Sequence, residues 1–177
     1  LLEKYGGELV EFPYTENPEY EFFDMRANQL RYMPEIRRGK LKRALRLTER
    51  PLRVLEAHNG ITGLIVENAK VEKDDEIKQF DAIWVSSLCD STAKGKPDIE
   101  LVDTTSRENT INEIMEVTTK PIILDGDTGG LIEHFVYKIK TLERMGVSAI
   151  IIEDKVGLKK NSLFGTDVQQ SQDTIEH

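Results

Sequence analysis

The chain has 177 residues, of which 38% are hydrophobic and 32% are charged, a composition typical of one globular domain. Its formal net charge of −8 would repel a phosphodiester backbone, so we expect no nucleic-acid partner. The apolar runs are too short to span a bilayer, and no signal-peptide pattern opens the sequence. The single cysteine, Cys89, excludes an internal disulfide. We therefore expect a cytoplasmic protein with no membrane partner.

The first fifty residues show little periodicity. One apolar run at residues 8–12 is followed by Pro13 and by an aromatic, acidic stretch through Tyr32. Six basic residues then crowd into ten positions: Arg37, Arg38, Lys40, Lys42, Arg43 and Arg46. We interpret them as the solvated face of a short linker helix whose apolar side consists of Leu41, Leu45 and Leu47.

From residue 51 onward, short apolar runs alternate with amphipathic stretches. The runs predict four buried parallel strands near residues 52–56, 81–86, 120–125 and 148–153. A helix with a capping box formed by Thr105 and Glu108 is expected before the third strand. Another helix is expected before the fourth strand and should end near Gly146; its apolar face consists of Leu131, Phe135, Ile139 and Leu142.

This alternation of strand and helix predicts a parallel α/β fold. Four such units amount to the first half of a (β/α)8 barrel, which needs roughly 250 residues when closed. An open, doubly wound sheet fits the same pattern. Because the sequence lacks an initiator Met and stops in a polar run at His177, we expect the fold to be incomplete at both ends.

Polar side chains follow the predicted strands, at the edge where parallel α/β enzymes carry their active sites. Asp125 and Asp127 are two residues apart, so both carboxylates would point to one side if the strand continued through them. Glu153 follows the next strand. Carboxylates of this kind bind Mg²⁺, although a polar turn would account for the Asp-Gly-Asp sequence alone. Strands before and after this segment, together with the second acidic strand end at Glu153, favour a metal site.

Two other segments have both a functional and an ordinary interpretation. His58, after the first strand, is either catalytic or packed at a strand end. The basic loop between Gly157 and Gly165 is either solvated or a lid that closes over an anionic substrate.

Four segments together resemble the phosphoenolpyruvate mutase family of the isocitrate lyase superfamily: residues 56–60 (EAHNG), 90–98 (DSTAKGKPD), 125–130 (DGDTGG) and 153–162 (EDKVGLKKNS). The resemblance implies a (β/α)8 barrel that forms homo-oligomers when complete and uses Mg²⁺. It implies an isomerase of phosphonate biosynthesis, which moves a phosphoryl group between phosphoenolpyruvate and 3-phosphonopyruvate. The partner would be this small-molecule substrate, and a half barrel alone would be inactive.

The resemblance also assigns roles to individual residues. It makes Asp127 a direct Mg²⁺ ligand, and Asp125 and Glu153 ligands that act through water. Catalytic roles fall on Asp98, Lys159 and Asn161. Substrate contacts fall on the pocket-wall residue Trp84, the hydroxyl of Ser86, the backbone amides of Ser87 and Leu88, and the loop residue Ser162.

Residues 5–15 resemble the tail of a cytidylyltransferase-like domain, although no nucleotide-binding turn follows them. We therefore expect two parts: residues 1–50, a domain tail with a linker, and residues 51–177, the first half of the barrel. Three alternatives remain open. They are a carbon–carbon lyase, a phosphonopyruvate hydrolase and a non-catalytic half-barrel fragment. A lyase of this superfamily carries a cysteine in the loop, where this chain has Asn161 and Ser162.

Overall fold

The computed structural model describes residues 30–157, 159–161 and 171–174. The described residues from Arg31 onward belong to one compact unit, which begins directly after Leu30. The segment expected to resemble a cytidylyltransferase tail, residues 5–15, lies outside the described residues, as does Ser162. The expected division of the chain at residue 50 therefore stays a prediction.

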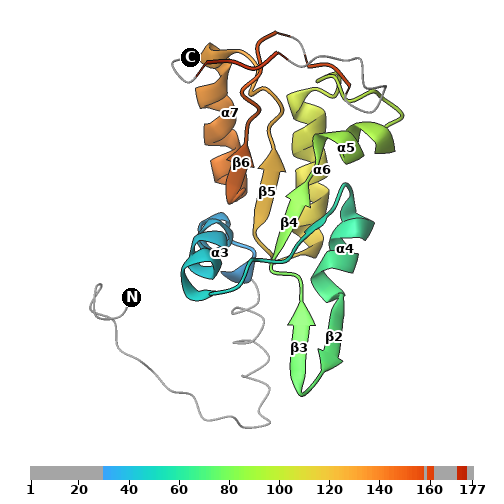
Figure 1. The fold of residues 1–177 in the computed structure, drawn as a ribbon, viewed down its shortest axis with the longest axis vertical. Coiled ribbons are helices and arrows are strands. Elements are labelled where there is room, and N and C mark those ends of the chain that lie inside the picture. Colours follow the sequence, from blue (N-terminus) through green and yellow to red (C-terminus); the bar gives the residue numbers. More distant parts are fainter. Residues whose placement is uncertain (1–29, 158, 162–170, 175–177) are drawn as a thin grey trace, which may run out of the picture. The chain divides into compact units, whose positions relative to one another are not determined.

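Four parallel strands form the main sheet: β1 (Val54–Glu56), β4 (Ala82–Val85), β5 (Ile122–Asp125) and β6 (Ala149–Ile151). Their order is β1-β4-β5-β6, so each strand lies beside the next one along the chain (Figure 1). This order confirms the expected arrangement, and it differs from a doubly wound sheet, in which the strand order reverses.

Helices follow each of the first three sheet strands: α4 (Gly60–Asn68), α5 (Ser87–Ala93) with α6 (Thr104–Val117), and α7 (Ile132–Met145). Local sequence sets their ends. Asn59 and Thr62 form a capping box at the start of α4, and Gly146 ends α7 with a left-handed φ of 101°. The capping box expected at Thr105 is wrong. The N-cap of α6 is Asp103, whose carboxylate accepts from the Ser106 amide at 3.0 Å.

One face of the sheet carries the core. Ile83 and Val85 of β4 lie beside Ile122 and Leu124 of β5, and all four pack with the apolar faces of α4 and α6. The opposite face is less covered, since Trp84 and Ile123 are half-buried there and Ile151 is 55% exposed. The apolar sequence runs therefore reflect one fully buried face rather than two.

A hairpin that the sequence analysis did not anticipate lies between α4 and β4. Strands β2 (Lys70–Lys73) and β3 (Glu76–Gln79) are antiparallel and mostly exposed. Asp74 and Asp75 form the turn with φ values of 55° and 60°, which is the geometry of a tight two-residue hairpin. In Figure 1 the hairpin extends from the amino ends of the sheet strands, away from the carboxyl ends.

Helix α3 (Pro34–Leu47) corresponds to the expected linker helix, but its buried side is different. Leu41 is buried, whereas Leu45 and Leu47 are 64% and 76% exposed. Arg37, expected on the solvated face, is only 1% exposed and donates to the carbonyls of Met115 and Lys120. Helix α3 is therefore anchored by a buried arginine that binds the carboxyl end of α6 and the turn after it.

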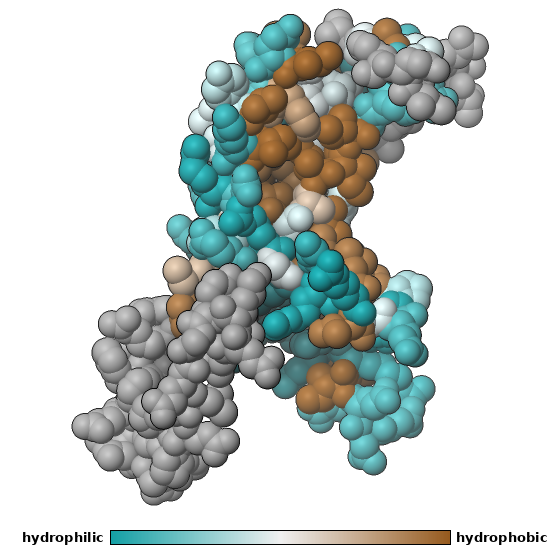
Figure 2. Space-filling view, turned by 90° about the vertical axis from the view of Figure 1, so that its left-hand side faces the viewer, coloured by the Kyte–Doolittle hydropathy of each residue, from teal (hydrophilic) through white to brown (hydrophobic). Residues whose placement is uncertain are grey.

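The side of the molecule that carries α7 and β6 shows a broad hydrophobic band (Figure 2). In α7 and β6, the exposed large hydrophobic residues include Ile132, Val136, Tyr137 and Ile151. In the described sheet, β6 forms one edge and β1 the other. No helix among the described residues has the length and apolar character needed to cross a bilayer.

Candidate active site

The backbone turns sharply just after β5, at Asp127. The strand ends at Asp125, and Asp127 has a left-handed φ of 54°. The strand thus ends where it was predicted to end and does not continue through Asp127, so strand alternation does not set the directions of both carboxylates. The Asp127 amide instead donates to Asp125 Oδ1 at 3.1 Å, and the Glu153 amide donates to the Asp127 carbonyl at 2.8 Å. These bonds stabilise the turn that brings the carboxylates together.

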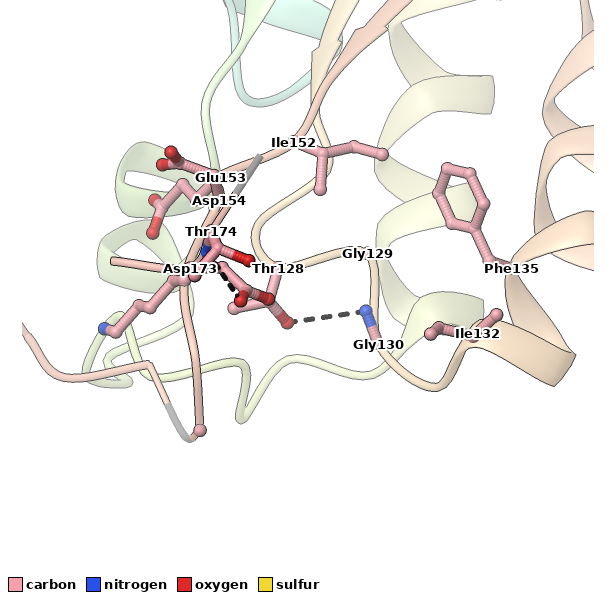
Figure 3. A pocket seen from close by; sticks show the side chains of 12 residues that line it. Thr128, Gly129, Gly130, Ile132, Phe135, Ile152, Glu153, Asp154, Asp173 and Thr174 are labelled. Carbon is pink, nitrogen blue, oxygen red and sulfur yellow. Dashed lines mark hydrogen bonds between the residues drawn. The ribbon is translucent and has the colours of Figure 1, made fainter. Parts of the chain in front are cut away.

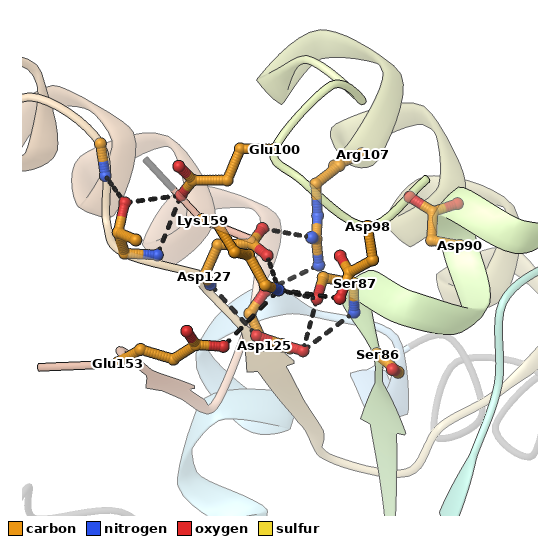
Figure 4. A network of polar contacts seen from close by, with 12 residues as sticks. Ser86, Ser87, Asp90, Asp98, Glu100, Arg107, Asp125, Asp127, Glu153 and Lys159 are labelled. Carbon is orange, nitrogen blue, oxygen red and sulfur yellow. Dashed lines mark hydrogen bonds and ion pairs between the residues drawn. The ribbon is translucent and has the colours of Figure 1, made fainter. Parts of the chain in front are cut away.

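The Lys159 ammonium lies at the centre of the cluster (Figure 4). Its Nζ is 2.5 Å from Asp127 Oδ1, 3.0 Å from Asp98 Oδ2 and 3.5 Å from Glu153 Oε1, and it donates to Ser87 Oγ at 2.9 Å. Burial opposes the charge of Lys159, but hydrogen bonds and attraction from Asp127 and Asp98 outweigh it and raise the pKa of the amine. The structure thus gathers a positive charge and three carboxylates around one point.

Asp125 lies beside this point and has different partners. Its Oδ2 accepts from the Ser87 amide at 3.0 Å and from the Ser87 hydroxyl at 2.8 Å. Burial would raise the pKa of the Asp125 carboxyl, but these bonds and the Asp127 amide outweigh burial and lower it. Asp125 is therefore held as a carboxylate.

Arg107, which the sequence analysis did not single out, is the second cation of the cluster. It projects from α6 and is 7% exposed. One guanidinium nitrogen is 2.7 Å from Asp127 Oδ2, and the other donates to the Asp125 carbonyl at 2.7 Å. Its sequence neighbours give no signal of this role, since the contacts join a helix to a loop 18 to 20 residues further along the chain.

Apart from Ser162, the predicted substrate-binding residues lie at the end of β4 and the start of α5. Ser86 is the N-cap of α5, and its hydroxyl accepts from the Cys89 amide at 3.4 Å. Trp84 and Leu88 are half-buried. The Ser87 amide already donates to Asp125. For this amide to bind substrate as predicted, it must either be shared between Asp125 and the substrate or leave Asp125.

Two more candidates lie in the turn after β1 and in the loop after β6. His58 Nδ1 lies 3.1 Å from Glu56 Oε2, and its backbone amide donates to Thr62. These contacts join His58 to the end of β1 and to the first turn of α4. Asn161 is half-buried in the loop that carries Lys159, and its role stays a prediction.

A cavity of about 450 Å³ lies beside the cluster (Figure 3). Glu153 belongs both to its wall and to the contacts of Lys159. Ile132, Phe135 and Ile152 form an apolar side, and the backbone of residues 128–130 forms another part of the lining. Open space for a small molecule is therefore next to the carboxylates, while the centre of the cluster is filled by Lys159.

The donor set suits a hard divalent cation, although the described side chains do not form a ready metal site. No three His, Cys, Asp or Glu side chains among them are arranged to hold a metal ion as they stand. Carboxylates nevertheless converge on the Lys159 ammonium, which marks a place where positive charge is stabilised. The buried Asp98 Oδ1 has no hydrogen-bond partner in the described structure. Oxygen ligands with one unsatisfied acceptor fit the chemistry of Mg²⁺.

Comparison with known proteins places this site in a family. A family model described as phosphoenolpyruvate phosphomutase matches residues 41–177. The chain belongs to this family. The match contains every site residue discussed above, including Arg107, but its first residue lies within α3.

Individual relatives of the phosphoenolpyruvate phosphomutase family agree with this assignment. The chain is 33% identical to a phosphoenolpyruvate phosphomutase of Tetrahymena pyriformis over 118 residues, which are 66% of this chain and 36% of that protein. The solved structure of the phosphoenolpyruvate phosphomutase from Streptomyces platensis subsp. rosaceus is similar at a TM-score of 0.67 and 27% identity. That match covers 78% of this chain and 45% of the other.

A hydrolase is also among the similar structures. A phosphonopyruvate hydrolase, solved in complex with oxalate and Mg²⁺, matches at a TM-score of 0.60 and 27% identity, over 70% of this chain and 41% of the other. The chain thus spans less than half the length of the proteins it matches. The four parallel strands, in sequence order, correspond to part of the (β/α)8 barrel fold of these neighbours.

Proposed function

We propose that the full-length protein is a magnesium-dependent phosphoenolpyruvate mutase, which interconverts phosphoenolpyruvate and 3-phosphonopyruvate in phosphonate biosynthesis. The observation that carries this proposal is the cluster of Asp98, Asp125, Asp127 and Glu153 around Lys159 at the carboxyl edge of the sheet, in a chain of the phosphomutase family. Such a site binds a cation and an anion together, as the transfer of a phosphoryl group requires.

The residues that would hold Mg²⁺ are Asp127 directly, and Asp125 and Glu153 through water. When bound, the ion would neutralise the negative oxygens of the substrate's pyruvate part. Asp125 is kept ionised by the Ser87 hydrogen bonds. These bonds therefore keep a ligand in its charged form without a metal present.

Lys159 and Asn161 would act on the phosphoryl group. Lys159 carries its charge from the loop after β6, and a cation there stabilises negative charge spread over phosphoryl oxygens. Asn161, two residues later, offers an amide that can both donate and accept. When the loop excludes water, the enolate carbon and oxygen are the nucleophiles left to receive the phosphoryl group, and isomerisation results.

The loop also bears on the choice between mutase and lyase. A lyase of this superfamily is expected to use a loop cysteine, but the described loop positions hold Lys159, Lys160 and Asn161. The cysteine of the chain, Cys89, lies in α5, where burial and the charge of Glu56 raise the pKa of its thiol. A protonated thiol away from the loop is consistent with the mutase proposal.

Phosphorus NMR of the full-length protein with phosphonopyruvate and Mg²⁺ tests the proposal directly. We expect phosphoenolpyruvate as the main product, and loss of turnover with a chelator or with Asp127→Ala. Asp154→Asn is the control, since Asp154 is an exposed carboxylate after the neighbouring strand β6 that accepts from Gln172 instead of Lys159. If wild-type protein releases mainly inorganic phosphate and pyruvate, the protein is a hydrolase and the mutase proposal fails.

The same assay measures the role of Asn161. We expect Asn161→Ala to lower mutase turnover by at least roughly tenfold, which corresponds to about 1.4 kcal/mol of transition-state stabilisation. The fraction of phosphate released should rise, because water would compete for the transferred group. Unchanged turnover and an unchanged product ratio would contradict this role.

A further inference from the structure

The two carboxylate oxygens of Asp127 have partners of different kinds (Figure 4). Oδ2 is 2.7 Å from a guanidinium nitrogen of Arg107, and Oδ1 is 2.5 Å from the Lys159 ammonium. Both contacts are buried. The carboxylate is therefore held from two sides by two cations that come from separate elements.

Arg107 is the more constrained of the two cations. It stands on α6, which packs against α4 and contributes Ile111 and Ile114 to the core. Its second nitrogen donates to the Asp125 carbonyl at 2.7 Å, so the guanidinium fork binds two points of the same turn. A planar fork with two short contacts fixes orientation as well as charge. The position of Asp127 Oδ2 is thus set by the scaffold.

Lys159 has a looser arrangement. A single ammonium on a flexible stem is shared among Asp127, Asp98, Glu153 and Ser87. Its contacts to Asp98 and Glu153 would remain when another cation took its place at Asp127. Oδ1 is therefore the oxygen that an incoming cation can reach, whereas Oδ2 is already occupied by Arg107.

We propose that Arg107 is a positioning residue that makes Asp127 a one-oxygen ligand, and that it thereby favours Mg²⁺ over Ca²⁺ at this site. The inference rests on the metal site of the proposed function. Ca²⁺ accepts six to eight oxygens in flexible geometry and commonly binds both oxygens of a carboxylate. Mg²⁺ is smaller, requires near-octahedral geometry and is served by one oxygen per carboxylate. Blocking Oδ2 removes an arrangement that only the larger ion exploits.

A purely structural or purely electrostatic role for Arg107 predicts a different outcome. Loss of the buried hydrogen bonds of Arg107 would lower the affinity for both ions. Loss of its positive charge would raise the affinity for both, because the two ions carry equal charge. Only the positioning role changes the ratio of the two affinities. The ratio is therefore the decisive measurement.

The experiment is calorimetric titration of the full-length protein with Mg²⁺ alone and with Ca²⁺ alone. In Arg107→Gln we expect the ratio of Ca²⁺ to Mg²⁺ affinity to rise by roughly tenfold, because Oδ2 becomes available. Arg37→Gln is the matched control. Arg37 is also a buried arginine that donates to two backbone carbonyls of the α6 region, but it contacts none of the site carboxylates. Its ratio should equal that of the wild type.

Arg107→Lys keeps a positive charge but not the fork, and it serves if Arg107→Gln does not fold. We expect the ratio to move in the same direction and by less. A ratio within about threefold of wild type in each Arg107 variant that folds would overturn the inference, as would an equal change in Arg37→Gln.

Mutase turnover of the wild type, measured separately, distinguishes this failure from failure of the proposed function. A wild-type protein that isomerises phosphonopyruvate while the Arg107 variants keep its ion ratio would refute only the inference. A wild-type protein that binds neither ion would refute both.

Discussion

The steric environment of Gly126 gives the sharpest test of how the site is built. Gly126 is buried between Asp125 and Asp127, and its amide donates to the Ile151 carbonyl at 2.7 Å. A Cβ at this position would lie 2.7 Å from both Cγ1 and Cδ1 of Ile150 and 3.0 Å from the Ile151 carbonyl oxygen. The site turn therefore packs against β6 with no room for a methyl group.

The magnitude of Gly126→Ala follows from these distances. Carbon atoms in contact normally lie about 3.5–4.0 Å apart, so the turn and β6 must separate by roughly 1 Å. Overpacking of this kind costs about 1–3 kcal/mol. For a domain of roughly 250 residues, the size of a closed (β/α)8 barrel, that corresponds to a fall in Tm of roughly 2–12 °C. A displacement of about 1 Å at Asp127 should also lower turnover on the order of a hundredfold.

The assay combines thermal unfolding with phosphorus NMR turnover of the full-length protein. Gly39→Ala is the control, since a Cβ at Gly39 meets nothing within 4 Å. Because Gly39 lies inside helix α3, this substitution should stabilise the protein by roughly 0.5–1 kcal/mol. Gly126→Ala should cost less stability in an Ile150→Ala background than in the wild type, because Ile150→Ala removes two of the three close atoms. If Gly126→Ala changes stability by less than about 0.5 kcal/mol and leaves turnover intact, the reasoning is refuted.

Three further predictions concern other parts of the chain. Burial would raise the pKa of Glu67, but bonds from Thr118 and Thr119 outweigh it and lower the pKa below the ordinary 4.5. Glu67→Gln should therefore cost about 1–3 kcal/mol at neutral pH, and denaturant titrations should show that the cost fades as pH falls through the lowered pKa. Asp103→Ala removes the α6 N-cap and should cost about 1 kcal/mol by the same titrations; no change would contradict the capping role. The 177-residue chain on its own should self-associate in light scattering and lack mutase turnover, because β6 is an edge strand beside an exposed hydrophobic band; a monomeric, active chain would show otherwise.

The sequence by itself determined the four strands of the main sheet, their parallel order and most of the side chains gathered at the candidate site. Buried strands need short apolar runs, and these survive as local patterns at residues 122–125 and 149–151. Right-handed connections then place successive strands side by side. Because the carboxyl ends of parallel strands share one edge, Asp125 and Glu153 had to come close. The left-handed glycine that ends α7, Gly146, was likewise a local signal.

Only the tertiary structure decided which charges pair. Arg107 meets Asp127 across 20 positions of the sequence, and Arg37 meets the Met115 carbonyl across 78. Arg37 lies in a basic segment that was interpreted as a solvated helix face, and Arg107 was not singled out at all. Burial of an arginine depends on acceptors that come from elsewhere in the chain, and no local pattern contains them. For the same reason the left-handed turn at Asp127 was not foreseen: its conformation is held by bonds to Asp125, Arg107 and Glu153, which exist only once the sheet and α6 have packed.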